Sequence, residues 1–433
     1  MASFWWMIGI LFAMLLIGAP VILAIGTAGA AYFLLEPGMM AQMLIYPMKF
    51  FNNIDSFVFL CIPLFILTGE LMSLTGMMDK LVRFCQMLVG GLKGGLAYVN
   101  VLASMLFAGI SGSALADISA LGPVEITMME TAGFDRSYST ALTAASAIQG
   151  PIIPPSIPMV LYASIASVSV GAMLFAGIIP GIMLGVGQMI VIFILGKTGK
   201  YNYPVSKLKL TPKLVLQETG AAFTALLMPV IILGGVTSGI FTATESAAIA
   251  VVYALLIGFL VYRNMTLKKL LGALRRTART TASIYLIVAF TGVIGWVIAV
   301  ENIPTIIEAW IRNSNMSVYM CLFLVNCFFL FNGCWISDTA QLLLFAPIFV
   351  PIFANMGISP IHFGCMMVVN VMISLITPPY GQALYLASGI SGVSLPILVK
   401  RILPFLAVCI IVLILVTYIP FFSTWIPTLV GLM

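Results

Sequence analysis

Residues 111–117 read SGSALAD and residues 332–338 read NGCWISD, and each run interrupts a long apolar stretch of the chain. The two stretches, 96–133 and 317–355, are otherwise apolar enough to lie in a membrane. A continuous spanning helix would not carry several small and polar residues at its middle. Two half-helices that meet at a tip would, because irregular backbone at membrane depth is tolerated where it is buried or lines a wet cavity. Both stretches are therefore predicted to be re-entrant hairpins, which enter and leave the membrane on one side.

The composition places the rest of the chain in a membrane as well. Of its 433 residues, 62% are hydrophobic and only 7% are charged, whereas a soluble domain carries about 25% charged residues. Apolar segments of roughly 20 residues, the length of a spanning helix, recur throughout. The sequence thus predicts an all-α polytopic membrane protein. The segments expected besides the two hairpins are 4–35, 54–75, 137–170, 171–196, 214–235, 241–262, 280–300, 359–391 and 400–422.

The basic residues test this count of spans. We take segment 54–75 to cross the membrane from the outside to the cytoplasm, and each later span to cross in the opposite direction to the one before it. With this topology, 17 of the 19 Lys and Arg residues fall on the cytoplasmic side, and Lys49 and Arg312 fall outside. Cytoplasmic loops carry such an excess of positive charge, so the net charge of +6 reflects membrane orientation and not nucleic-acid binding. Segment 4–35 lacks the basic start of a signal peptide and is predicted to be the first span. Gly18-Ala19-Pro20 leaves open a split into two short helices, and with it the side of the N-terminus.

The two tips belong to an internal repeat with an offset of 221–224 residues. The chain has only five Asp residues, so the recurrence of Asp at the same place in both tips is informative. Five spans separate each segment from its partner, and an odd number reverses the direction of the chain. The repeat is therefore predicted to be inverted, the arrangement that gives alternating-access transporters their two faces. The matched residues are Thr68-Gly69 with Thr291-Gly292, Gly112 with Gly333, Asp117 with Asp338, and Pro154-Pro155 with Pro378-Pro379.

Unwound backbone at the tips and at the two Pro-Pro pairs predicts cation sites. Proline lacks an N–H group and clashes with the preceding turn, so each pair leaves carbonyl oxygens without partners. Hard cations such as Na⁺ bind clusters of neutral oxygens of this kind in broken membrane helices. Two Na⁺ sites are expected, one in each repeat. The first comprises Ser111, Gly112, Ser113, Ile152 and Pro154, and the second comprises Asn332, Gly333, Cys334, Ser374 and Thr377.

The half-helix N-termini beyond the tips favour an anion, so the pocket beside the cation sites is predicted to bind an organic acid. Gly and Ser also serve close helix packing in membranes, and Asp117, Asp338 and Ser337 also suit helix capping. Both interpretations stay open for these residues. The candidate residues for solute binding are Ser111, Ser113, Asp117, Trp335, Ser337, Asp338, Tyr380 and Gln382.

Further polar residues are candidates of lower rank. Intramembrane carboxylates are functional candidates by default, which applies to Glu70, Glu218 and Glu245. Segment 264–279 has basic residues at helical spacing with Leu between them and is predicted to be an interfacial helix that binds anionic lipid. The seven Cys residues contain no CxxC motif and are expected to be free thiols, and the single His362 is expected to serve packing.

Three stretches resemble the large membrane subunit of tripartite ATP-independent periplasmic (TRAP) transporters. They are GISGSALADISALGPVEITMMETAGFDRSYSTALTAASAIQGPIIPPSIPMVLYASIA (109–166), MPVIILGGVTSGIFTATESAAIAVVYALLIG (228–258) and IPLFILTGELM (62–72). The resemblance implies a bacterial inner-membrane location, a separately encoded small membrane subunit and a periplasmic substrate-binding protein. It implies that Na⁺ is co-transported as the driving ion, without ATP or an organic cofactor, and that the solute is an organic acid. Sialic acid is favoured and a C4-dicarboxylate is the alternative.

The resemblance also implies an elevator mechanism, in which a transport domain moves against a scaffold. The expected scaffold and arm helices are 1–95 and 197–316. The expected transport domain comprises 96–196 and 317–395, each with one hairpin and one broken helix, and 396–433 holds the C-terminal helix. An ion-coupled organic anion transporter without a binding protein, or a passive channel, remains the alternative. An intramembrane enzyme is disfavoured, since the chain has no HExxH or GxSxG motif.

The predicted topology can be tested by labelling single-cysteine reporters in a cysteine-free variant. Reporters beside Lys209 and Lys269 are expected to react only with reagents applied from the cytoplasm, because the inside loops collect the basic residues. A reporter beside Arg312 is expected to react only from the periplasm. Labelling of the 197–213 loop from outside would overturn both the span count and the inversion.

Overall fold

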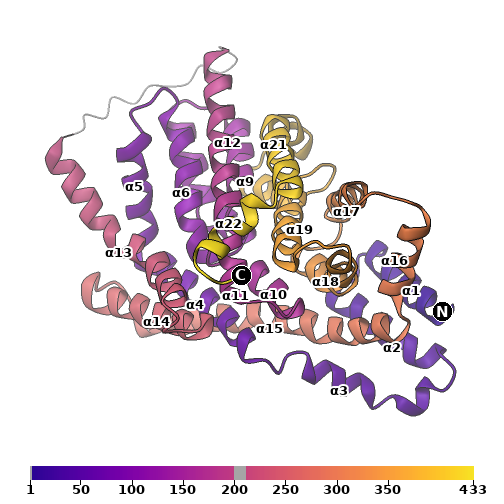
Figure 1. The fold of residues 1–433 in the computed structure, drawn as a ribbon. Coiled ribbons are helices and arrows are strands. Elements are labelled where there is room, and N and C mark those ends of the chain that lie inside the picture. Colours follow the sequence, from indigo (N-terminus) through magenta and orange to yellow (C-terminus); the bar gives the residue numbers. More distant parts are fainter. Residues whose placement is uncertain (1, 199–210) are drawn as a thin grey trace.

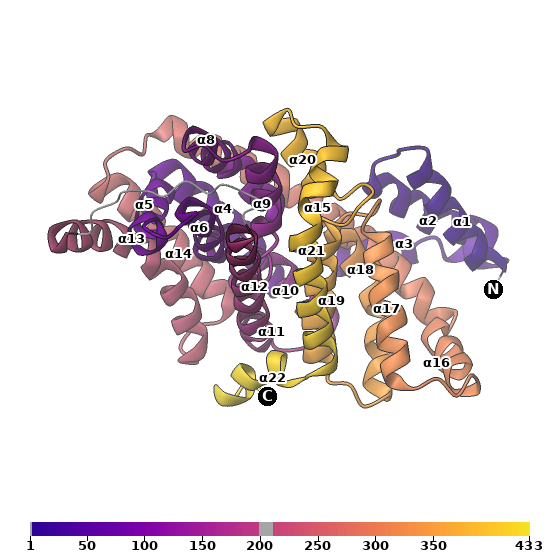
Figure 2. The same cartoon turned by 90° about the horizontal axis from the view of Figure 1, so that it is seen from above.

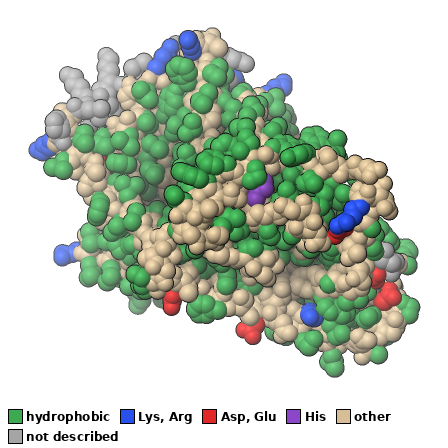
Figure 3. All heavy atoms as spheres, in the orientation of Figure 1, with side chains coloured by type: hydrophobic (Ala, Val, Ile, Leu, Met, Phe, Trp, Pro, Cys, Tyr) green, Lys and Arg blue, Asp and Glu red, His purple; other side chains and the backbone are tan. Residues whose placement is uncertain are grey.

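The computed structural model describes residues 2–198 and 211–433, with their side chains except those of 108–111, 212 and 214. Every regular element of these ranges is helical. Figure 3 shows apolar side chains over most of the visible face, with Lys and Arg mainly near its margin. The helices long and apolar enough to cross a membrane are Phe57–Thr75, Val170–Lys197, Val215–Thr237, Ala243–Val261, Leu267–Val300, Asp338–Asn355 and Leu395–Tyr418. The chain is thus an all-α, multi-pass membrane protein, as predicted.

The helices follow the predicted repeat in their order (Figure 1). Those before the gap at 199–210 are α1 (Ala2–Leu16), α2 (Val21–Leu35), α3 (Ile45–Asn52), α4 (Cys61–Thr75), α5 (Met77–Val89), α6 (Gly95–Ser111), α7 (Ala114–Ala120), α8 (Gly122–Thr131), α9 (Arg136–Ala147), α10 (Ile157–Ile165), α11 (Val170–Ala176) and α12 (Ile178–Lys197). Those after it are α13 (Pro212–Thr237), α14 (Ala243–Leu256), α15 (Leu267–Val300), α16 (Ile303–Asn313), α17 (Val318–Asn332), α18 (Asp338–Asn355), α19 (Pro360–Ser374), α20 (Gln382–Ser391), α21 (Leu395–Tyr418) and α22 (Phe421–Leu429).

Both apolar stretches fold as helical hairpins with the predicted tips. In the first, α6 ends at Ser111 and the chain returns through α7 and α8. In the second, α17 ends at Asn332 and the chain returns through α18, and Phe328 and Phe329 of α17 stack edge-on against Phe345 of α18. The side chain of Asn332 itself donates back to Phe328 O at 2.9 Å, which closes the last turn of α17.

The two hairpins open towards opposite faces of the molecule, and α21 shows this because it runs from one face to the other over about 36 Å. At its N-terminal end, Nε of Arg401 donates to Ser137 Oγ at 3.1 Å, just after the open end of the first hairpin. At its C-terminal end, Tyr418 Oη donates to Tyr319 O at 3.2 Å, at the open end of the second. Figure 2 shows the same separation, with α8 and α20 along the upper edge and α16 and α22 along the lower one. The predicted inversion of the repeat is therefore confirmed.

The predicted broken spans are also confirmed. Segment 137–170 divides into α9 and α10 around Pro154-Pro155, and segment 359–391 divides into α19 and α20 around Pro378-Pro379. Both Pro-Pro bonds are cis. Each break follows from the missing N–H groups and from the clash of the proline rings with the preceding turn.

Segment 4–35 is split at Gly18-Ala19-Pro20, the alternative that the sequence left open: α1 and α2 pack against each other after a turn at Gly18, where φ is +81°, and Pro20. Other predicted boundaries are wrong. Segments 264–279 and 280–300 are not separate, because one helix, α15, begins at Leu267 and continues to Val300 without a break. Helices α3, α5 and α16 lie in predicted loops. All three helices are short, and α5 and α16 are amphipathic, so hydropathy averaged along the sequence does not identify them as helices.

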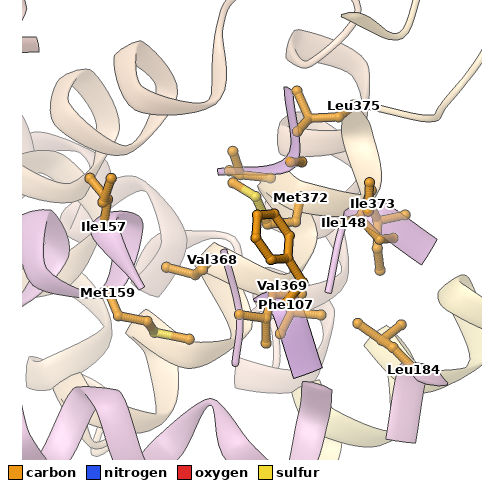
Figure 4. Packing of buried hydrophobic residues seen from close by; sticks show 14 of the residues in the cluster. Phe107, Ile148, Ile157, Met159, Leu184, Val368, Val369, Met372, Ile373 and Leu375 are labelled. Atoms are coloured by element: carbon orange, nitrogen blue, oxygen red, sulfur yellow. The ribbon is translucent and has the colours of Figure 1, made fainter. Parts of the chain in front are cut away.

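The long helix α15 lies along one edge of the molecule in Figure 1 and joins its two ends. It packs against α2 and α3 near one end, and against α4 and α18. The hairpins and broken helices pack together above it, and Figure 4 shows Phe107 of α6 beside Val369 and Met372 of α19, so that the two repeats share one apolar core.

Each repeat also holds its hairpin to its broken helix through buried amides and hydroxyls. In the first, Asn100 of α6 donates to Thr143 Oγ1 at 2.7 Å and accepts from Ser146 Oγ at 2.8 Å, both on α9. In the second, Asn370 of α19 donates to Asn326 Oδ1 of α17 at 2.6 Å. Buried polar groups that are paired in this way fix the register of neighbouring helices, because leaving either one unpaired is costly.

The contact between Gly364 and Tyr162 joins the two repeats and can be tested by substitution. Tyr162 of α10 donates from Oη to Pro360 O at 2.7 Å, and a Cβ built on Gly364 would lie 2.0 Å from its ring. Gly364→Ala is therefore expected to destabilise the protein by about 1–3 kcal/mol through overpacking, measured as a lower Tm in detergent. Gly389→Ala is the matched control, because its Cβ would meet nothing within 4 Å. An unchanged Tm for Gly364→Ala would contradict this tight contact.

Candidate functional site

The first tip packs directly against the first Pro-Pro break. Gly112 has φ +62°, and a Cβ there would lie 3.1 Å from Pro155 O and 3.3 Å from Ile157 N. Only glycine combines this backbone conformation with so close an approach. Ser113 follows as the N-cap of α7 and accepts a hydrogen bond from Ala116 N at 3.4 Å. The side chain of Ser111, a predicted ligand, lies outside the described part of the chain.

The second tip approaches the second break even more closely. A Cβ on Gly333 would lie 1.9 Å from Oγ of Ser374, so that glycine is required here by space alone. Cys334 Sγ lies 3.7 Å from Pro378 O. Ser337 is the N-cap of α18 and accepts a hydrogen bond from Ala340 N at 3.4 Å, as the capping interpretation expected. The structure thus brings each tip against its own Pro-Pro break in both repeats.

Two other predicted cation ligands, Ile152 and Thr377, have oxygens that contact groups other than the tips. The carbonyl of Ile152 lies against Gly177, where a Cβ would be 2.1 Å from its oxygen, and it is Pro155 O, next to Pro154, that faces the tip. Thr377 lies beside Ser374 in the second break, but its hydroxyl donates to Ile373 O at 2.9 Å.

A cavity of about 350 Å³ lies where the two hairpins meet α4 and α15. The tips contribute Gly112 and Ser113 from the first hairpin and Asp338 and Thr339 from the second, so residues from the two repeats line the same cavity. Residues of α4 and α15 also line the cavity. The described lining residues are Ile66, Gly69, Glu70, Ser73, Phe107, Gly112, Ser113, Ala116, Ser119, Ala120, Ile157, Pro158, Thr280, Ile284, Asp338 and Thr339.

Three predicted solute-binding residues lie elsewhere. Trp335, Tyr380 and Gln382 border a separate hollow of about 450 Å³, together with Cys334 and residues of α1. The second tip therefore separates this hollow from the cavity that Asp338 lines. Asp117 is buried, and Oδ2 of its carboxylate would lie 2.5 Å from a Cβ on Gly150, so it faces α9 and its break and does not belong to the described lining.

The sequence interpretation missed two buried polar residues near the tips. Gln341 donates from Nε2 to Ser374 Oγ at 3.4 Å, while its Oε1 has no hydrogen-bond partner within the described ranges. Glu125 of α8 is buried in the first hairpin. Position 120, which corresponds to Gln341 at the repeat offset, is Ala120, so recurrence gave no signal for it. Glu125 is a charged residue within the apolar stretch 96–133, and this was the signal that could have identified it.

The other candidate residues named from the sequence lie in different surroundings. Glu70 lines the cavity, whereas Glu245 forms a capping box with Thr242 at the start of α14, and Glu218 lies on α13 and does not line the cavity. His362 is buried and packs as expected, with Nδ1 2.7 Å from Ser423 Oγ and Nε2 3.1 Å from Thr417 O. The Cys residues are free thiols, as predicted.

Comparisons with known proteins agree with the resemblance seen in the sequence. The family described as "Tripartite ATP-independent periplasmic transporter, DctM component" matches residues 8–422. The chain is 40% identical to the sialic acid TRAP transporter large permease protein SiaM of Vibrio cholerae, over 87% of this chain and 88% of that protein. It is 37% identical to the C4-dicarboxylate TRAP transporter large permease protein DctM of Pseudomonas aeruginosa, over 94% and 95% of the two chains.

A solved structure shares the fold at low sequence identity. The crystal structure of the Alcanivorax borkumensis YdaH transporter, described as having an unusual topology, aligns with a TM-score of 0.65 at 15% identity. The alignment covers 92% of this chain and 91% of that one. The similarity supports the membrane architecture alone, because the identity is too low to carry a substrate.

Asp338 is the predicted site residue whose role can be tested most directly, because it lines the cavity and begins α18. Asp338→Asn keeps the side-chain volume and removes the charge, so solute uptake is expected to fall at least about tenfold while expression and Tm stay near those of the wild type. Asp79→Asn, at an exposed position in the first turn of α5, is the control and is expected to leave uptake unchanged. Normal uptake by Asp338→Asn would show that the residue serves only the N-terminus of α18 and not transport.

Proposed function

Because the chain belongs to the family of DctM components of tripartite ATP-independent periplasmic transporters, we propose that it is the large membrane subunit of a Na⁺-coupled importer of an organic acid. It resides in the bacterial inner membrane as a multi-pass protein. The observation that carries the proposal is the cavity of about 350 Å³ between the two inverted hairpin tips, since a site at the meeting of inverted repeats can be exposed to either side of a membrane.

Two Na⁺ sites, one behind each tip, provide the coupling in this proposal. Oxygens of Pro155 and Ser374 lie against Gly112 and Gly333, where the chain has left the helix. The buried Oε1 of Gln341, which lacks a hydrogen-bond partner within the described residues, adds a neutral oxygen to the second cluster. Neutral oxygens suit Na⁺ in broken membrane helices, and two bound cations would offset the charge of an anionic solute nearby.

The solute is proposed to be an organic acid, with sialic acid favoured and a C4-dicarboxylate as the alternative. Relatives at 40% and 37% identity are named for sialic acid and for C4-dicarboxylates, and another at 34%, YiaN of Escherichia coli, is named for 2,3-diketo-L-gulonate. All three solutes are carboxylates. The hydroxyls of Ser113, Ser119, Thr280 and Thr339 in the cavity lining suit hydrogen bonding to such solutes.

An elevator movement is the mechanism proposed for this site. The moving part would be α6–α12 with α17–α20, close to the segments 96–196 and 317–395 predicted from the sequence, and the fixed part would be the arms α1–α5 and α13–α16. Both groups of helices line the cavity, because α4 and α15 contribute residues to it and so do the two hairpins and α10. A separately encoded small membrane subunit and a periplasmic binding protein would complete the transporter.

Flux measurements in proteoliposomes test this function. The chain, reconstituted with its small subunit, is expected to take up sialic acid or succinate only when an inward Na⁺ gradient and the cognate binding protein are both present. Uptake that needs the gradient but no binding protein would instead indicate an ion-coupled organic anion carrier that acts alone. Uptake that needs neither would indicate a channel.

The dependence of that uptake on Na⁺ tests the two sites. A Hill coefficient above one is expected for Na⁺, and Ser374→Ala is expected to raise the half-saturating Na⁺ concentration about tenfold, because it removes a hydroxyl facing Gly333. Thr428→Ala, at an exposed position of α22, is the control for removal of a hydroxyl. A Hill coefficient near one in well-coupled vesicles would contradict two coupled sites.

A further inference from the structure

The cavity has an acidic lining, although the solute proposed for it is an acid. Its described lining residues include two carboxylates, Glu70 of α4 and Asp338 of α18, and no Lys, Arg or His. A carboxylate in the lining repels an anionic solute bound close to it, and the repulsion is strong where little water lies between the two charges. Asp338 starts the helix that follows the second tip, so the cation proposed at that tip would compensate its charge. Glu70 lies on α4 and not on a tip, and its charge therefore needs a separate partner.

Arg276 of α15 supplies that partner from the neighbouring arm. Its Nε and its Nη2 both lie 2.8 Å from Oε2 of Glu70. Thr280, one turn beyond Arg276 on α15, lines the cavity, and so does Ser73, close to one turn beyond Glu70 on α4. The ion pair thus stands at the cavity wall, where it joins the two arms that face the hairpin tips.

A role in stabilising the contact between α4 and α15 does not explain this ion pair. The side chains of Arg276 and Glu70 are 51% and 28% exposed, and ion pairs with such access to solvent contribute little to stability. The two arms are already joined by Tyr285 Oη, which donates to Phe59 O at 2.8 Å, and by Asn264 Nδ2, which donates to Thr75 O at 2.7 Å. The charges themselves are therefore the feature to explain.

The pair lies towards the end of the arms that the basic residues assign to the cytoplasm. The bond from Asn264 to Thr75 places the end of α4 beside the start of α15. That start carries Lys268 and Lys269, which the positive-inside rule assigns to the cytoplasmic side. Solute that leaves the tips for the cytoplasm would therefore pass Glu70 and Arg276.

We infer that Glu70 and Arg276 form a charge-paired gate on the arms, which sets how tightly the cavity holds an organic anion before its release to the cytoplasm. The inference rests on the proposed function, transport of an organic acid. Paired, the two groups present little net charge to the solute. Without Glu70, the guanidinium of Arg276 would attract the carboxylate and retain it. Without Arg276, the carboxylate of Glu70 would repel the solute and favour its release.

Opposite effects of the two single substitutions test the gate. The measured quantity is the KM for solute on the cytoplasmic side, in exchange assays with oriented proteoliposomes that contain the large and small subunits. The probe is sialic acid or succinate, whichever the wild type transports. Glu70→Gln is expected to lower this KM about three- to tenfold, and Arg276→Gln is expected to raise it by a similar factor. The double variant is expected to lie near the wild type, because it restores a neutral wall.

A purely structural ion pair gives a different pattern, since both single variants break it equally. Shifts of KM in the same direction for Glu70→Gln and Arg276→Gln, or no shift for either, would overturn the gate while leaving the proposed function intact. Failure of the wild type to transport any organic acid would overturn the proposed function and the gate with it. Glu308→Gln and Arg312→Gln on α16 are the controls, because their ion pair of 2.7 Å lies outside the cavity lining. Both are expected to keep the wild-type KM.

Discussion

Backbone amide and carbonyl groups that leave a helix at membrane depth must find partners inside the protein, because hydrocarbon provides none. This constraint governs the two tips and the two Pro-Pro breaks. In this chain each tip is packed inside the protein against its own break, with glycine at the point of contact. Gly112, with φ +62°, lies tightly against Pro155 and Ile157, and Gly333 lies so close to Ser374 that a Cβ would have no room. The hairpins, the broken helices and the cavity between them all depend on these two contacts.

The inversion of the repeat converts two such contacts into one shared cavity. Since the hairpins enter from opposite ends of α21, their tips approach each other inside the molecule, and Ser113 and Asp338 line the same wall. The repeats are not copies in detail. Asn100 pairs with Thr143 and Ser146, whereas Asn326 pairs with Asn370, so the same link between hairpin and broken helix is made by different side chains. Buried polar pairing is retained because unpaired groups in this environment are costly.

Electrostatics then relates the cavity to its proposed cargo. Neutral oxygens near the tips suit cations, while the carboxylates in the lining would oppose an acid unless each is compensated. The proposed cations lie near Asp338, and Arg276 neutralises Glu70 from outside the lining. Helix α4 and the second hairpin thus contribute separate charges to one cavity, and the proposed movement between them would change which charges the solute meets.

The sequence by itself determined the membrane class, the two hairpins, the Pro-Pro breaks and the inversion, because each of these follows from local composition or from recurrence at a fixed offset. Gly112, Asp117 and their partners are examples, since their spacing alone identified both tips. The tertiary structure decided which of the candidate residues share a cavity. It placed Asp338 in the lining but Trp335 and Tyr380 in another hollow, it placed the Ile152 carbonyl against Gly177, and it revealed Gln341 and the partner of Glu70. Such contacts join residues far apart in the sequence, 206 positions in the case of Glu70 and Arg276, and they depend on how helices pack across the repeats, which no local pattern encodes.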